Sequence, residues 1–94
     1  MKYARAHLIE YISEQEANSS LADYAEKAPS EFPEAEILLT IRTGPYTAIS
    51  VSVYPDEETA VKTMVARNER AVKMTNVTKN VELHQGEVSL SVVR

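Results

Sequence analysis

The fold is decided by residues 36–74, EILLTIRTGPYTAISVSVYPDEETAVKTMVARNERAVKM. Apolar side chains alternate along residues 36–42 and again along residues 47–54, and both stretches are rich in β-branched residues. This period-two pattern predicts two strands, and the Gly-Pro pair within residues 43–46 predicts a tight turn between them. Asp56, followed by two glutamates, is typical of a helix N-cap, so a helix is predicted from there to the end of the stretch.

The segment before this unit, residues 2–12, fits two descriptions. Alternating side chains suit a strand, whereas a stripe of Ala4, Leu8, Tyr11 and Ile12 suits a helix. We favour the strand because Ser13-Glu14-Gln15-Glu16 forms a capping box, which marks the start of a helix rather than its middle.

The capping box predicts a helix from about residue 14 to residue 28. Apolar side chains recur in it at intervals of three and four residues: Ala17, Leu21, Tyr24, Ala25 and Ala28. Pro29 and Pro33 are expected to end this helix.

Two further extended stretches close the chain, at residues 79–84 and 87–93, with Gln85-Gly86 as a turn or bulge between them. The predicted order is therefore β-α-β-β-α-β in one domain spanning residues 1–94. This is the ferredoxin-like α+β class, an antiparallel sheet with two helices on one face.

The strands differ between their two faces. One face is apolar, in the sets Ile37/Leu39/Ile41, Ile49/Val51/Val53 and Val88/Leu90/Val92. The other collects small or polar residues, among them Thr40, Ala48, Ser50, Ser52 and Ser89, and Arg5 and His7 join it if the first strand keeps its register. We expect the apolar face to lie under the helices as the core, and the small-residue face to be open to solvent or to a second copy.

Composition narrows the possible functions. A chain of 94 residues without cysteine has no disulfide and no thiolate metal site, so association is the remaining reinforcement for a small core. A net charge of −4 argues against nucleic acid, and no apolar run is long enough for a membrane span. We expect a cytoplasmic protein without a bound cofactor.

The chain resembles the dimeric α+β barrel superfamily, which includes antibiotic-biosynthesis-monooxygenase-like proteins. The resemblance covers the element order and is strongest at residues 49–60, where a strand runs into an acidic-capped helix, and at Gly86-Glu87-Val88. It implies a homodimer whose sheets form a barrel, with a small organic ligand in each subunit. The enzymes of this family use a Trp, an Asn and a His or Tyr around the pocket. This chain has no Trp, so no catalytic residue is carried over.

Four residues are candidates for a ligand pocket: His7, Arg42, Tyr54 and Asn68. His7 is a candidate general base or anion ligand, with an ordinary surface or interface histidine as the alternative. Asn68 is the one polar member of the predicted apolar stripe of the second helix, and we favour an idle amide at the edge of the stripe over one that faces a ligand. The other members of the stripe are Ala60, Val61, Met64, Val65, Ala71 and Val72. No spacing of histidines and carboxylates predicts a metal site.

Three functions remain open from the sequence. The preferred one is a homodimer that binds a small organic ligand or acts structurally. The second, implied by the resemblance alone, is a cofactor-independent monooxygenase-like enzyme acting on a small aromatic compound. The third is an adaptor that binds another protein through its open sheet face.

Overall fold

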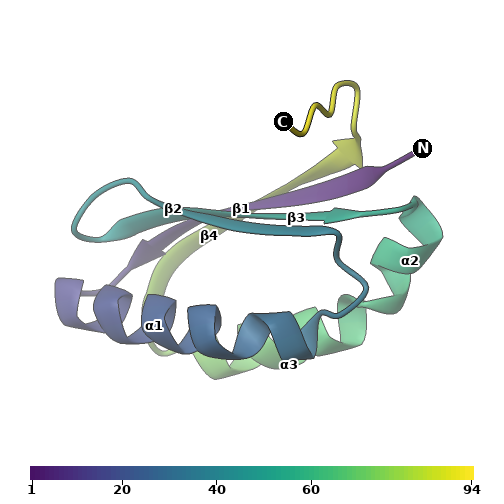
Figure 1. The fold of residues 1–94 in the computed structure, drawn as a ribbon. Helices are drawn as coiled ribbons and strands as arrows, with labels where there is room; N and C mark the ends of the chain where they lie inside the picture. The colour runs from purple at the N-terminus through teal and green to yellow at the C-terminus, as the bar shows by residue number, and fades with distance from the viewer.

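A computed structural model describes all residues 1–94, as a four-stranded sheet with helices on one face only (Figure 1). The elements in chain order are β1 (Tyr3–Tyr11), α1 (Glu14–Glu31), β2 (Ile37–Arg42), β3 (Thr47–Tyr54), α2 (Glu57–Lys62), α3 (Met64–Met74) and β4 (Thr78–Glu87). The strands lie in the order β2-β3-β1-β4, and every neighbouring pair is antiparallel. The predicted ferredoxin-like topology is confirmed.

Local signals predicted the starts of α1 and α2 correctly. Tyr3–Tyr11 is a strand, as favoured, and the Ser13 hydroxyl accepts a hydrogen bond from the Glu16 amide at the start of α1. Asp56 caps α2 in the same way through the Thr59 amide. The first helix is longer than predicted, since it continues through Pro29 to Glu31.

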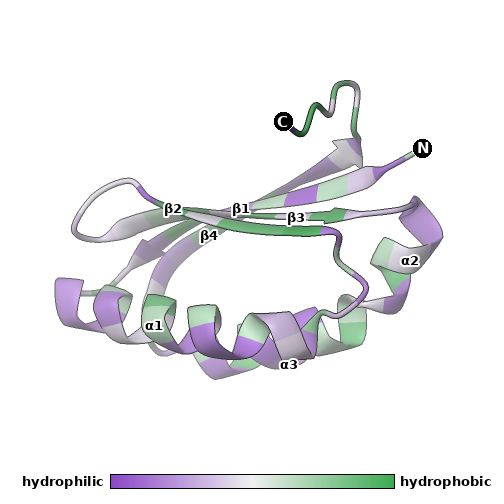
Figure 2. Ribbon diagram, in the orientation of Figure 1, coloured by the Kyte–Doolittle hydropathy of each residue, from purple (hydrophilic) through white to green (hydrophobic).

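The C-terminal prediction was wrong. β4 runs without interruption through Gln85-Gly86 to Glu87, and residues 88–94 form no strand. The Val88 amide still donates to the Lys2 carbonyl, but the chain then leaves the sheet on the side away from the helices (Figure 1). Residues 88–94 therefore form an exposed apolar tail, in which Leu90, Val92 and Val93 are largely open to solvent (Figure 2).

The orientation of the sheet is the reverse of the one expected. The small-residue face lies under the helices, where Ala48, Ser50, Ser52 and Tyr54 are all buried. On the apolar face Ile37, Leu39 and Ile41 remain exposed, Leu39 to 50%, whereas Val53 is buried. The register supplies a physical reason, because bulky residues of β1 lie beside small ones of β3, with Arg5 opposite Ser52 and Ile9 opposite Ala48.

The predicted apolar stripe of the second helix was wrong at its valines, although its Ala60 is buried. That helix is two consecutive helices, and Val61, Val65 and Val72 point to solvent, Val65 being 69% exposed. The inward stripe is instead Ala60, Thr63, Arg67, Arg70 and Met74, spaced three and four residues apart. Two arginines therefore occupy core-facing positions, and the reason is that α1 offers them partners.

Arg5 joins α2 to the sheet. Its side chain is only 2% exposed, and its guanidinium donates to the Thr63 hydroxyl, the Ala60 carbonyl and the Gln85 side-chain oxygen. The Ala60 carbonyl lies in the last turn of α2, where the negative end of the helix dipole favours a cation. A polar anchor thus replaces the apolar packing expected for this helix.

Candidate functional site: a cavity between the sheet and the helices

A cavity of about 310 Å³ lies between the small-residue face of the sheet and helices α1 and α3. Its lining comes from all three: His7, Ile9, Tyr11, Thr40, Ser50, Thr78 and Val81 from the strands, Ser20, Leu21 and Tyr24 from α1, and Arg67, Arg70, Ala71, Met74 and Thr75 from α3 and its end. The volume is within the range of small-molecule sites. Small side chains on β3 leave room that larger ones would fill.

The floor of the cavity carries a short row of polar groups. His7 on β1 lies opposite Ser50 on β3, and Ser50 lies opposite Thr40 on β2. The two hydroxyl oxygens of Ser50 and Thr40 are 3.5 Å apart, at the limit of a hydrogen bond. A ligand in the cavity would find donors and acceptors along one line across three strands.

His7 is neutral at physiological pH. Burial, with the positive charges of Arg67 and Arg5 adding to it, lowers the pKa of His7 to about 4. A neutral imidazole has one nitrogen that donates and one that accepts a hydrogen bond. His7 is therefore suited to orient a ligand, and it is a weak base.

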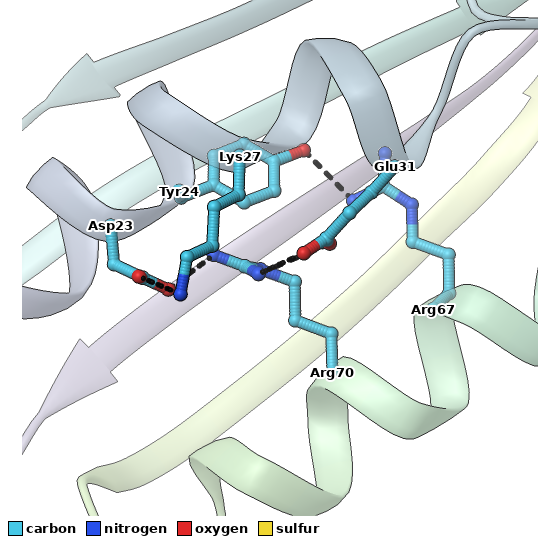
Figure 3. A network of polar contacts seen from close by, with 6 residues as sticks. All are labelled: Asp23, Tyr24, Lys27, Glu31, Arg67 and Arg70. Carbon is cyan, nitrogen blue, oxygen red and sulfur yellow. Dashed lines mark hydrogen bonds and ion pairs between the residues drawn. The ribbon is translucent and has the colours of Figure 1, made fainter.

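Arg67 reaches from α3 to the opposite helix (Figure 3). Its Nη1 donates to the Tyr24 hydroxyl at 2.9 Å, and its Nη2 makes a longer contact of 3.4 Å with the Tyr54 hydroxyl. The guanidinium carbon lies 3.9 Å from the centre of the Phe32 ring, a cation–π distance. Aromatic groups thus hold this arginine in place.

Arg70, one turn further along α3, has a different set of partners (Figure 3). It donates to Asp23 at 3.1 Å and to both carboxylate oxygens of Glu31 at 3.1 and 3.2 Å. The bonds to Lys27 and Arg70 keep the pKa of the Asp23 carboxyl low. This network ties α3 to α1 along one side of the cavity.

Only one of the four predicted pocket residues lines the cavity. His7 does so, and Tyr54 is fully buried nearby, where its hydroxyl contacts Arg67. Arg42 instead closes its own hairpin, donating to the Gly44 and Pro45 carbonyls at 2.7 and 2.9 Å. Asn68 is exposed on α3, which agrees with the favoured idle amide.

Sequence reasoning missed Arg67 and Arg70. A usable signal was present, because Ala60, Thr63, Arg67, Arg70 and Met74 follow the spacing of a buried helix face. The apolar side chains of this helix predicted a different inward face, one that included Val61, Val65 and Val72 and left both arginines mainly on other faces. Burial of the two arginines depends on Tyr24, Asp23 and Glu31, which are distant in sequence.

The chain has a ferredoxin-like fold, and solved structures share this class of fold over nearly its whole length. One of them is described as a dimeric ferredoxin-like protein, in line with the resemblance indicated by residues 49–60. No protein-family model matches the sequence, and no curated protein matches it significantly.

Three solved structures illustrate this class. A protein of unknown function from Nitrosomonas europaea superposes with a TM-score of 0.81 and 14% identity, over 99% of this chain and 94% of that one. A dimeric ferredoxin-like protein from an uncultured marine organism gives 0.79 and 13%, over 99% and 92%. SnoaB, a cofactor-independent oxygenase from Streptomyces nogalater (studied as a mutant), gives 0.76 and 11%, over 99% and 98%. At such identities the likeness establishes the fold alone.

The structure contains no group of three or more histidine, cysteine, aspartate or glutamate side chains arranged to hold a metal ion. No helix is both long and apolar enough to cross a membrane.

Proposed function

We propose that the protein is a homodimer that binds a small organic ligand in the cavity of each subunit. The observation that carries the proposal is the cavity itself, an apolar space with a polar row of His7, Ser50 and Thr40 along its floor. Sites for small molecules combine apolar walls with a few placed polar groups in this way.

Association is supported by the open face of the sheet. That face presents Leu8, Ile37, Leu39 and Ile41, each more than one third exposed, and the apolar tail leaves the sheet on the same side. A contiguous apolar surface of this kind marks an interaction site in a soluble protein. One protein of the same fold is described as dimeric.

Ligand binding is tested by filling the cavity. Ala71 lines the cavity from α3, so Ala71→Phe should occupy part of the space, whereas Ala22→Phe places the same ring on an exposed position of α1 outside it. Small aromatic and aliphatic compounds are screened by chemical-shift changes in ¹⁵N-labelled protein. We expect compounds that bind the wild type and Ala22→Phe but not Ala71→Phe. Binding that is insensitive to Ala71→Phe would contradict the proposal.

A second candidate is a cofactor-independent oxygenase acting on a small aromatic compound. The favouring observation is a neutral imidazole, His7, in a largely apolar cavity, on a fold that an oxygenase also has. Oxygen uptake with quinol-type substrates should then exceed the uncatalysed rate and fall in His7→Ala. Equal uptake with and without protein would leave ligand binding as the function.

A further inference from the structure

The three arginines around the sheet–helix layer differ in how their charge is compensated. Arg70 is paired with two carboxylates, Asp23 and Glu31. Arg5 has no carboxylate, but each of its three guanidinium nitrogens donates a hydrogen bond and its side chain is almost fully enclosed. Both are satisfied within the protein.

The guanidinium of Arg67 has neither a carboxylate partner nor a full set of hydrogen bonds. Its hydrogen-bond partners are two uncharged phenols, those of Tyr24 and Tyr54, and the second contact is long at 3.4 Å. Its other neighbour is the uncharged ring of Phe32, 3.9 Å from the guanidinium carbon. Its Nε is enclosed without any hydrogen-bond partner. A guanidinium has five N–H groups, so Nη1 and Nη2 each keep one that these contacts do not use. A partly buried cation normally has an anionic partner, and none is provided here by the chain.

The rest of the cavity does not supply the missing negative charge. None of its lining residues is an aspartate or a glutamate, and the other lining arginine is already paired with carboxylates of α1. Its remaining polar lining consists of hydroxyl groups and the neutral imidazole of His7. The cavity is thus apolar in its walls and positive at one place.

We propose that the ligand of this cavity is a small, largely apolar organic acid whose carboxylate binds Arg67. The Ser50 and Thr40 hydroxyls and the His7 imidazole line the same cavity and are available to the rest of the ligand. The planar guanidinium suits a carboxylate because two N–H groups can meet two oxygens. This inference rests on the proposed function, since it names the class of ligand for the same site.

The test compares acids with amides of the same shape: benzoate with benzamide, and 1-naphthoate with 1-naphthamide. Dissociation constants are measured by titration calorimetry at one ionic strength. For wild-type protein we expect each acid that binds to do so at least about tenfold more tightly than its amide, as a charge-assisted hydrogen bond predicts. In Arg67→Met the preference should fall below about threefold, with the affinity for the amide retained.

Two further variants separate charge from structure. Arg67→Lys keeps the charge and should retain part of the preference. Arg42→Met removes an arginine outside the cavity, whose bonds stay within its own hairpin, and should leave the preference unchanged. Circular dichroism and the retained affinity for the amide show that Arg67→Met is folded.

The outcomes distinguish this inference from the proposed function. Equal binding of acid and amide, blocked by Ala71→Phe, would overturn the organic-acid ligand and leave the cavity as a binding site. A preference that survives in Arg67→Met would also overturn the role of Arg67. Failure of both pairs and of the wider screen to bind would overturn the proposed function together with the inference.

Discussion

The two faces of the sheet have exchanged the roles that hydrophobicity alone assigns to them. The helix-covered face carries serines, threonines, a histidine and an arginine, and it encloses a cavity. The open face carries isoleucine, leucine and valine. In a single-subunit protein this arrangement would be costly, because apolar area left in water loses about 25 cal/mol per Å². It becomes favourable if a second copy covers the open face, and the inner face is then free to hold a ligand.

The role of the open face as an interface is tested most directly at its centre. Val51 pairs with Ala6 on one side and Leu39 on the other. Val51→Arg would bury an unpaired charge in the interface between two copies, so we expect a dimer of about 21 kDa (2 × 10.5 kDa) to dissociate into monomers. Light scattering on a size-exclusion column over a range of concentrations measures this.

Val65→Arg makes the same change on the exposed outer side of α3 and should leave the mass unchanged. A dimer that persists in Val51→Arg would show that the open face is not the interface. A wild-type protein that is monomeric at every concentration would instead favour the adaptor hypothesis, with another protein on this face.

The covered face is tested at Tyr54, which is fully buried against the helices. Tyr54→Ala removes a large ring from the core and one phenol from Arg67, so the free energy of unfolding should fall by about 3–5 kcal/mol. Tyr46→Ala, at a turn position where the ring is 49% exposed, should change it by less than about 0.5 kcal/mol. Urea denaturation at equal protein concentration compares them, and similar losses in both variants would contradict the assignment of the covered face.

The pH dependence of stability tests whether burial lowers the pKa of His7 in the folded protein. Because the pKa of His7 is about 4 in the folded protein and 6.5 in the unfolded chain, protons bind the unfolded chain first as the pH falls below 6.5. Between pH 7.5 and 4.5 this group should cost the wild type about 2–3 kcal/mol, a loss that His7→Gln should lack. Urea denaturation at the two pH values measures the difference, and His84→Gln, at an exposed histidine, serves as the control.

The smallest effect is expected at Asn68, on the exposed side of α3. Asn68→Leu should change the free energy of unfolding by less than about 0.5 kcal/mol, because no buried partner is lost. Ligand affinity measured by calorimetry should also be unchanged. A clear loss of stability or of affinity would show that the Asn68 amide makes a hydrogen bond that matters for folding or for ligand binding.

Local sequence signals predicted the order of the strands and helices up to α3 and the residues at which α1 and α2 begin. Ser13 and Asp56 cap helices through bonds that span only three residues, and the alternation along residues 47–54 forms a strand. Such signals involve residues close together in the sequence, so they can be predicted without knowledge of the fold. The topology and the resemblance to the dimeric α+β barrel class followed from this order.

Which face of the sheet the helices cover depends on long-range contacts, and so does the set of residues that line the site. A period-two pattern separates the two faces of a strand but does not say which one is buried. That choice depends on contacts between residues far apart in the chain, such as Arg67 with Tyr24 and Arg70 with Glu31. These contacts allow two arginines to lie on the inner face of α3, where valine would be expected. The sequence alone makes His7 a candidate, because the pKa of an ordinary histidine lies near neutrality. Arg67 becomes a candidate only through its contacts with Tyr24 and Tyr54, which the fold creates.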